Sequence, residues 1–136
     1  MTSNTALLSI GKQRRFIIDS GASYHLIGDD DLTQRERKTF KDLDSPIELQ
    51  SANSLVTVTQ TALIDVRPLD LRVRAHVLPE AQLLLSLGRL IRYNNLRCIW
   101  DKAAGVVLQE TFGRRRKFIC TSHNDVPYLA NYVDNS

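Results

Sequence analysis

A mostly apolar run, Arg15-Phe16-Ile17-Ile18, leads directly into the polar segment Asp19-Ser20-Gly21-Ala22-Ser23. Aromatic and β-branched residues closed by a glycine predict a β-strand that is buried on both faces and ends at a turn. A carboxylate at the end of such a strand is costly to bury unless it has hydrogen-bond donors or a chemical task. Asp, Ser and Gly are also common at ordinary strand-to-turn corners, so Asp-Ser-Gly alone does not separate a structural role from a functional one.

The longer stretch from Phe16 to Ile27 resembles the catalytic loop of retroviral-type aspartic proteases. It is most similar to the copia-type retrotransposon branch, in which an apolar pair precedes Asp-Ser-Gly-Ala-Ser, any residue and His. A second match, Leu84-Leu85-Ser86-Leu87-Gly88-Arg89-Leu90, resembles the apolar-apolar-Gly segment that crosses behind the catalytic loop in that family. The resemblance covers about residues 14–130. It implies an all-β, retropepsin-like closed barrel of the acid-protease fold, homodimeric, with one short helix after Gly88.

The resemblance also implies a role for each residue of the loop. Asp19 would supply the catalytic carboxylate, and the Ser20 hydroxyl would bond across the two-fold axis to lock two loops together. Gly21 would support the loop. The substrate-binding residues of the loop would be Gly21, Ala22 and Ser23, the first two through their backbone.

Two residues are expected behind the loop. In the family, the glycine that matches Gly88 packs closely against the catalytic loop, and a helix after it carries an arginine in the place of Arg89. In retroviral relatives this arginine pairs with an acid just after the loop. Ser23 occupies that position here, so the sequence leaves the partner of Arg89 open.

Two β-rich runs, Pro46–Gln50 and Leu55–Thr59, flank small polar residues and predict a hairpin. By position it resembles the flap that closes over bound peptide in retroviral proteases. The resemblance therefore adds the hairpin tip to the substrate-binding residues: Ser51, Ala52, Asn53 and Ser54. Typical flaps carry glycines at the tip and this one has none, which leaves a plain surface hairpin as the alternative.

Strand patterns dominate the rest of the chain, and helical patterns are few and short. Leu71–Val77 alternates so that Arg72, Arg74 and His76 share one face, which predicts a solvent-facing His76. Asp30 or Asp31 is expected to cap a helical turn over residues 32–37. Further strands are expected over residues 96–100, 105–109 and 117–121, with an edge segment at 127–130.

The composition fits one modest domain. A chain of 136 residues with 43% hydrophobic residues is ordinary for a single globular domain. The resemblance implies an N-terminal extension (1–13), one protease-like domain (14–130) and a C-terminal tail (131–136). No apolar run is long enough to span a bilayer, and no signal-peptide pattern opens the chain. Two cysteines favour a reducing compartment. The basic run Arg114-Arg115-Arg116-Lys117 lacks interleaved aromatic residues, so a solvated turn is preferred over a nucleic-acid site.

Other catalytic and metal-binding patterns are weak. Cys98, Cys120 and His123 are too scattered to give the four close ligands of a zinc site, so no metal and no cofactor is expected. Ser23 lies outside a Gly-x-Ser-x-Gly elbow, which argues against a serine hydrolase. Cysteine–histidine catalysis stays open at this point, although nothing in the sequence marks either thiol as activated.

Peptide hydrolysis by two carboxyl groups needs one charged group to take a proton from water and one neutral group to hydrogen-bond the scissile carbonyl. The chain holds one Asp-Ser-Gly, and its nearest echo, Asp44-Ser45-Pro46, has proline in place of glycine. A single chain with two such loops would need roughly twice this length. The second Asp19 is therefore expected from a second copy of the chain.

These features are interpreted as a homodimeric aspartic endopeptidase that processes a retrotransposon Gag-Pol polyprotein in cytoplasmic virus-like particles. Its substrate would be its own polyprotein, bound as an extended polypeptide in the manner of an added strand. No membrane partner is expected, and nucleic acid is disfavoured for this domain. The alternatives are a non-catalytic retropepsin-like module that binds peptide or assembles particles, and a small basic RNA-associated β-domain.

Overall fold

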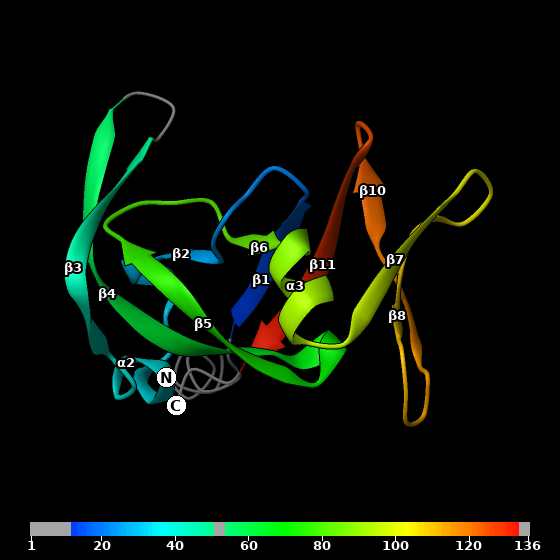
Figure 1. The fold of residues 1–136 in the computed structure, drawn as a ribbon, viewed down its shortest axis with the longest axis horizontal. Helices are drawn as coiled ribbons and strands as arrows, with labels where there is room; N and C mark the ends of the chain where they lie inside the picture. Colours follow the sequence, from blue (N-terminus) through cyan, green and yellow to red (C-terminus); the bar gives the residue numbers. More distant parts are fainter. Residues whose placement is uncertain (1–11, 51–53, 134–136) are drawn as a thin grey trace, which may run out of the picture.

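The computed structural model describes residues 12–50 and 54–133, which are mostly β-strand (Figure 1). The strands are β1 (Lys12–Asp19), β2 (Leu26–Gly28), β3 (Lys41–Gln50), β4 (Leu55–Val66), β5 (Leu71–Leu78), β6 (Leu84–Ser86), β7 (Leu96–Asp101), β8 (Gly105–Glu110), β9 (Lys117–Ile119), β10 (Thr121–His123) and β11 (Val126–Val133). The helices are α2 (Gln34–Arg37) and α3 (Leu87–Tyr93), with single 3₁₀ turns η1 (Asp29–Asp31) and η2 (Arg67–Leu69). In these ranges no helix has the length and apolar character needed to cross a membrane. The all-β prediction is confirmed.

Eight strands form one sheet in the order β10-β11-β1-β6-β2-β5-β4-β3, and β7, β8 and β9 form a second sheet. Most neighbouring strands are antiparallel, but β6 is parallel to β1 and β5 is parallel to β2. β6 lies between β1 and β2, so the two strands that flank the loop at residues 20–25 pair with β6 and not with each other. The end of β6 therefore lies at the base of that loop.

The large sheet does not close into the barrel that the sequence suggested. Within the described residues its edges are β3 and β10, which lie far apart in Figure 1. Closure would require these two edge strands to meet. Instead β3 pairs with β4 alone, as one arm of a hairpin, and most of its residues are exposed. The pairing has a register shift between Asp42 and Ile47. The expected hairpin is present, and its first strand, β3, begins earlier than the predicted run Pro46–Gln50.

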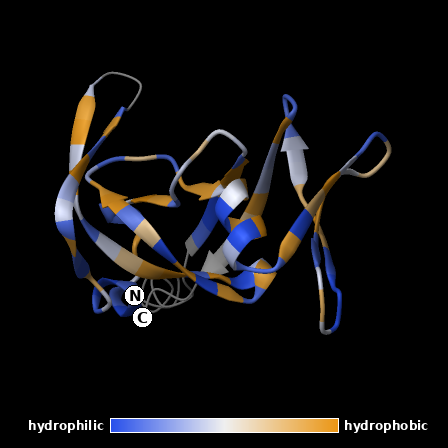
Figure 2. Cartoon of the chain, viewed as in Figure 1, coloured by the Kyte–Doolittle hydropathy of each residue, from blue (hydrophilic) through white to orange (hydrophobic). Residues whose placement is uncertain are grey.

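One hydrophobic core joins the two sheets. Phe16 and Ile18 of β1 belong to the same buried cluster as Leu108 of β8. Hydrophobic and hydrophilic residues alternate along many of the strands (Figure 2). β1 follows this alternation, since Arg15 is exposed and Ile17 is half-buried. The expectation that this strand is buried on both faces was therefore wrong, because one of its faces is open to solvent at Arg15.

The C-terminal segment lies inside the sheet and not at its edge as predicted. β11 is antiparallel to β1 on one side and to β10 on the other. Its register joins Lys12 to Val133, so the pairing continues beyond the expected domain limits of 14 and 130 on both sides. Pairing on two sides satisfies backbone donors and acceptors that an edge strand leaves open.

A capping box sets the start of α2. The Thr33 hydroxyl accepts from the Glu36 N–H at 3.1 Å, and the Glu36 carboxylate accepts from the Thr33 N–H at 3.0 Å. These reciprocal bonds satisfy two backbone donors at the helix start. The prediction of Asp30 or Asp31 as the cap was wrong, since both belong to the separate turn η1.

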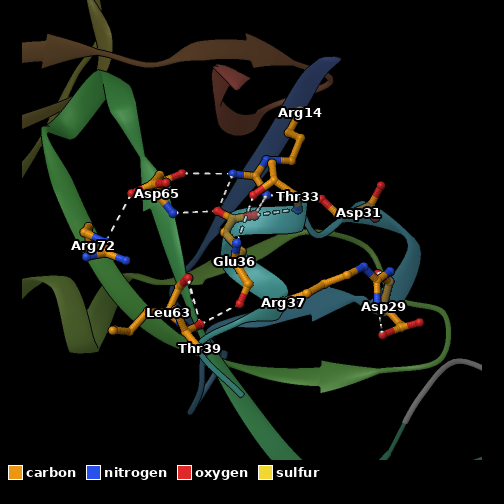
Figure 3. A network of polar contacts seen from close by, with 10 residues as sticks. All are labelled: Arg14, Asp29, Asp31, Thr33, Glu36, Arg37, Thr39, Leu63, Asp65 and Arg72. Atoms are coloured by element: carbon orange, nitrogen blue, oxygen red, sulfur yellow. Dashed lines mark hydrogen bonds and ion pairs between the residues drawn. The ribbon is translucent and has the colours of Figure 1, made fainter. Parts of the chain in front are cut away.

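A buried ion pair ties β1 to α2 and β4 (Figure 3). Arg14 and Glu36, both almost fully buried, form a bidentate pair with N–O distances of 2.7 and 3.0 Å. Arg14 also donates to the Asp31 and Asp65 carbonyls, and the Asp65 N–H donates to Glu36 at 2.7 Å. Burial raises the pKa of Glu36, but hydrogen bonds from Arg14, Thr33 and Asp65 outweigh it and hold this pKa below its ordinary value. Both charges are thus compensated inside the fold.

We predict that Glu36→Gln destabilises the protein by about 3–5 kcal/mol, because it leaves the Arg14 guanidinium buried without a counter-charge. Urea unfolding at fixed protein concentration measures the change. The matched control is Arg37→Gln, one position along, which breaks the ion pair with Asp29; those side chains are 35% and 45% exposed. That control should cost no more than about 1 kcal/mol. Equal losses in the two variants would contradict the prediction.

Candidate active site

Asp19 is the last residue of β1, and its carboxylate turns back onto the loop that follows. Its Oδ1 accepts a hydrogen bond from the Gly21 N–H at 2.8 Å. A Cβ at position 21 would lie 3.4 Å from the same oxygen, in ordinary van der Waals contact with the carboxylate. Asp19 is half-buried while Ser20 and Gly21 are exposed. The carboxylate is therefore held by its own loop at the surface of the chain.

The loop at residues 20–25 is anchored from behind by the end of β6 and the start of α3. The Ser86 hydroxyl donates to the Ala22 carbonyl at 2.7 Å, and the Ser86 N–H donates to His25 Nδ1 at 3.0 Å. Arg89 Nε donates to the Ser23 carbonyl at 2.7 Å. The Ser86 oxygen also accepts from the Arg89 N–H and so caps α3. One buried serine thus fixes both the loop and the helix.

His25 takes part in this anchor as a neutral ring. Its Nδ1 is an acceptor, so that nitrogen carries no proton in the folded protein. Burial lowers the pKa of His25 to about 4, and the positive charge of Arg89 and the neighbouring His76 act in the same direction. The ring therefore stays neutral through the neutral and mildly acidic range.

A layer of rings covers this anchor on the outside. The Tyr24 and His76 rings lie 4.4 Å apart between centroids, and the Arg89 guanidinium lies 5.1 Å from the centre of Tyr24. The prediction that His76 faces solvent was wrong, because Tyr24 packs against it and leaves it half-buried. His76 Nδ1 is buried and has no hydrogen-bond partner in the described part of the chain.

A cavity of about 320 Å³ lies beside Asp19 and Ser20. Its other walls come from distant parts of the sequence, including Trp100 of β7, Val126 of β11 and Asp125 from the turn before β11. Trp100 and Val126 are 67% and 41% exposed, so the carboxylate borders an open apolar surface. Asp125 is a second carboxylate on the same cavity.

The structure brings Arg89 to the loop as the sequence suggested, and it identifies the partner that the sequence left open. Arg89 bonds to the backbone carbonyl of Ser23 and needs no acidic side chain there. Gly88 differs from the expectation. A Cβ at position 88 would meet just the Ser86 hydroxyl oxygen, at 4.0 Å, so Gly88 does not pack tightly against the loop. The contact comes from Ser86, and α3 already begins at Leu87.

The hairpin residues expected to bind substrate are described in part. Ser51, Ala52 and Asn53 lie outside the described residues, and Ser54 is exposed next to the start of β4. The tip-side ends of β3 and β4 and the loop between β1 and β2 lie toward the same side of the molecule, the top in Figure 1. The hairpin and the loop that follows β1 therefore lie on a common side of the molecule.

Sequence reasoning gave no role to Ser86, His25, Asp125 or Trp100. His25 was readable as the last residue of the loop pattern, and Ser86 as a polar residue inside an apolar run. No residues near Asp125 or Trp100 in the sequence indicate a role for them, because pairing between distant strands brings both to the cavity.

The structure disfavours catalysis by a cysteine nucleophile. Burial raises the pKa of the Cys120 thiol to about 11, with the nearby Cys98 adding to the shift, and burial also raises the pKa of Cys98. A thiol must ionise to act as a nucleophile, so neither cysteine is activated. Among the described residues no group of three or more His, Cys, Asp or Glu side chains is placed to hold a metal ion.

Comparison with known proteins gives no relative on which to rest a function: no family model, no curated protein and no solved structure matches the chain.

The neutral state of His25 makes stability depend on pH. Its pKa of about 4 in the folded chain lies below the ordinary 6.5, so the unfolded chain binds more protons between these values. The contribution of His25 is complete above pH 6.5 and is lost as the pH falls toward 4. We predict that His25→Asn, which keeps an acceptor for the Ser86 N–H but does not titrate, flattens the fall in unfolding free energy between about pH 7 and pH 5.

Urea unfolding at several pH values measures that slope. His76, whose pKa is also lowered by burial and by Arg89, should supply the slope that remains in the variant. The same slope in wild type and His25→Asn would show that the His25 ring does not titrate as assigned.

Proposed function

We propose that the chain is an aspartic endopeptidase that acts as a homodimer, with Asp19 from each copy forming the catalytic pair. The observation that carries the proposal is the placement of Asp19. Its carboxylate is held by the Gly21 N–H, borders a cavity, and sits on a loop that Ser86 and Arg89 anchor from behind. Fixed geometry of this kind is what positioned acid–base catalysis needs. The resemblance of the loop sequence to copia-type proteases supports the same assignment.

The proposed chemistry uses two carboxyl groups that share one proton, because two carboxylates held close together cannot both ionise. The charged member takes a proton from water, whose oxygen attacks the scissile carbonyl carbon. The neutral member hydrogen-bonds the carbonyl oxygen, and a proton then passes to the leaving amine. Each chain brings one Asp19, so a second copy related by a two-fold axis completes the pair. The exposed position of Ser20 beside Asp19 is compatible with a hydrogen bond across that axis.

We assign the substrate as extended polypeptide from the protein's own Gag-Pol precursor, cut in cytoplasmic virus-like particles, as the copia-type resemblance implies. An extended peptide between the β3–β4 hairpin and the Asp19 loop would bind by backbone pairing, as an added strand does. In this arrangement Gly21 and Ala22 offer backbone groups to the peptide. A non-catalytic peptide-binding module is the competing assignment, and the two tests below separate it from an enzyme.

We predict that Asp19→Asn lowers cleavage of a fluorescence-quenched peptide library by at least about 10²–10⁴-fold, since it removes the group that accepts the proton. Asp125→Asn is the matched control, because Asp125 lies on the same cavity but is not part of the proposed pair. That variant should keep cleavage close to wild type. Loss of activity in both variants would indicate that Asp19 and Asp125 form a carboxyl pair within one chain. Cleavage at the wild-type rate by Asp19→Asn would refute the proposed aspartic endopeptidase.

We further predict that inactive chains poison active ones. When wild-type and Asp19→Asn chains are unfolded and refolded together in equal amounts, about a quarter of the dimers carry two Asp19 residues, by random pairing. Cleavage per wild-type chain should therefore drop to about half. Differently tagged subunits confirm that chains exchange. A rate per wild-type chain that stays constant despite exchange would mean that each chain carries a complete site.

A further inference from the structure

A second cavity, of about 290 Å³, lies between the base of the β3–β4 hairpin, β5 and α3. Four basic side chains contribute to its lining: Lys41, Arg74, His76 and Arg89. Arg89 also bonds to the Ser23 carbonyl, on the loop that carries Asp19. The cavity therefore borders the proposed active-site loop on the side of the hairpin.

The two arginines of this lining have no ion-pair partner in the part of the chain that the structure describes. Arg74 and Arg89 are half-buried, yet neither forms an ion pair within the described residues. Arg74 donates to the Thr61 hydroxyl at 3.1 Å and to the Thr39 carbonyl at 3.4 Å, and Arg89 donates to the Ser23 carbonyl at 2.7 Å. All three acceptors are neutral. A guanidinium that is partly withdrawn from water favours a carboxylate, which matches its planar set of donors.

His76 adds an unsatisfied polar atom to the same lining. Its Nδ1 is buried and has no partner in the described residues. A buried polar atom without a partner is destabilising, and such atoms in folded proteins call for an explanation. An acceptor oxygen brought into the cavity would satisfy His76 Nδ1 when that nitrogen carries the ring proton.

The cavity also has two acidic side chains, Asp42 and Asp44. Both are exposed, and the Asp42 carboxylate already accepts from the Gln60 amide at 3.1 Å. Water and salt screen exposed charges strongly, and half-buried charges less. The less exposed Arg74 and Arg89 therefore contribute more to the electrostatic potential inside the cavity than the exposed Asp42 and Asp44 do.

We propose that this cavity binds an acidic side chain of the peptide substrate, glutamate or aspartate, with Arg74 as its main partner and with Arg89 and His76 beside it. The proposal rests on the proposed function and deepens it, because it turns a general peptide site into one that selects acidic residues. A peptide bound between the hairpin and the Asp19 loop would pass this cavity, because Arg89 both lines it and bonds to the Ser23 carbonyl, and one side chain of that peptide would then enter it.

The test compares the rates for peptides that carry Glu or Gln at each position around the cleaved bond. For wild type, kcat/KM should favour Glu over Gln about tenfold at one position, the ratio that a charge-assisted hydrogen bond of about 1.4 kcal/mol produces. Arg74→Gln should lose that preference, and Arg74→Glu should favour Lys there instead. Arg72→Gln is the matched control, since Arg72 lies on the same face of β5 but pairs with Asp65 and does not line the cavity. It should keep the wild-type preference.

The outcomes separate this proposal from the proposed function. Cleavage without a Glu preference, or with the same preference in wild type and Arg74→Gln, overturns the acidic subsite and leaves the endopeptidase standing. If no peptide is cut, the endopeptidase fails, and calorimetry with the same Glu and Gln peptides then tests the cavity alone. Glu peptides that bind wild type no better than Arg74→Gln would overturn the subsite in that case as well.

Discussion

The position of β6 between β1 and β2 is the constraint on which the rest of the site depends. Because β6 runs parallel to β1, Ser86 lies opposite Asp19 in the sheet, and its hydroxyl and N–H both point into the loop that Asp19 begins. The same serine starts α3, which places Arg89 within hydrogen-bond distance of the Ser23 carbonyl in that loop. A loop that would otherwise be a simple strand-to-strand connection is thereby held at three points, through Ala22, Ser23 and His25.

The fold treats its buried charges in two different ways. Arg14 is paired with Glu36 in the interior, and each supplies what the other needs, so the pair fixes strands and helix without leaving a net charge. Arg74 and Arg89 sit nearer the surface and bond to neutral oxygens. The first arrangement compensates both charges within the fold, while the second leaves the arginine charge without an acidic partner among the described residues. This contrast distinguishes structural arginines from candidate binding arginines more clearly than burial does.

Prediction from the sequence succeeded where a short stretch of residues determines its own secondary structure. The strand before Asp19 and the hairpin strands on either side of residues 51–54 were predicted from neighbouring residues, and the helix containing Arg89 from the family resemblance. The cap of α2 could also have been predicted from the sequence, because Thr33 and Glu36 have the spacing of a capping box. The prediction chose the upstream aspartates instead, because aspartate is a common helix cap. In that case a specific spacing was more informative than residue type.

Features that depend on distant strands were not predictable in the same way. The alternation in β5 led to the wrong prediction of a solvent-facing His76, because Tyr24 arrives from another part of the chain and packs against that ring. The open sheet, the inner position of β11 and the meeting of Trp100 and Asp125 at the Asp19 cavity likewise follow from pairing order. The order in which strands pair cannot be predicted from any short stretch of a single sequence.

The neutral histidine behind the loop bears on the pH range in which a carboxyl pair can work. Two carboxyl groups that share a proton titrate in the acidic range, and their activity depends on holding one proton between them. An anchor that gained charge in that range would loosen the loop just as the proposed carboxyl pair reached its working state. His25 avoids this, because burial and Arg89 hold its pKa at about 4 and its Nδ1 remains an acceptor for the Ser86 N–H above that value. The support behind Asp19 therefore keeps its hydrogen bonds through mildly acidic conditions.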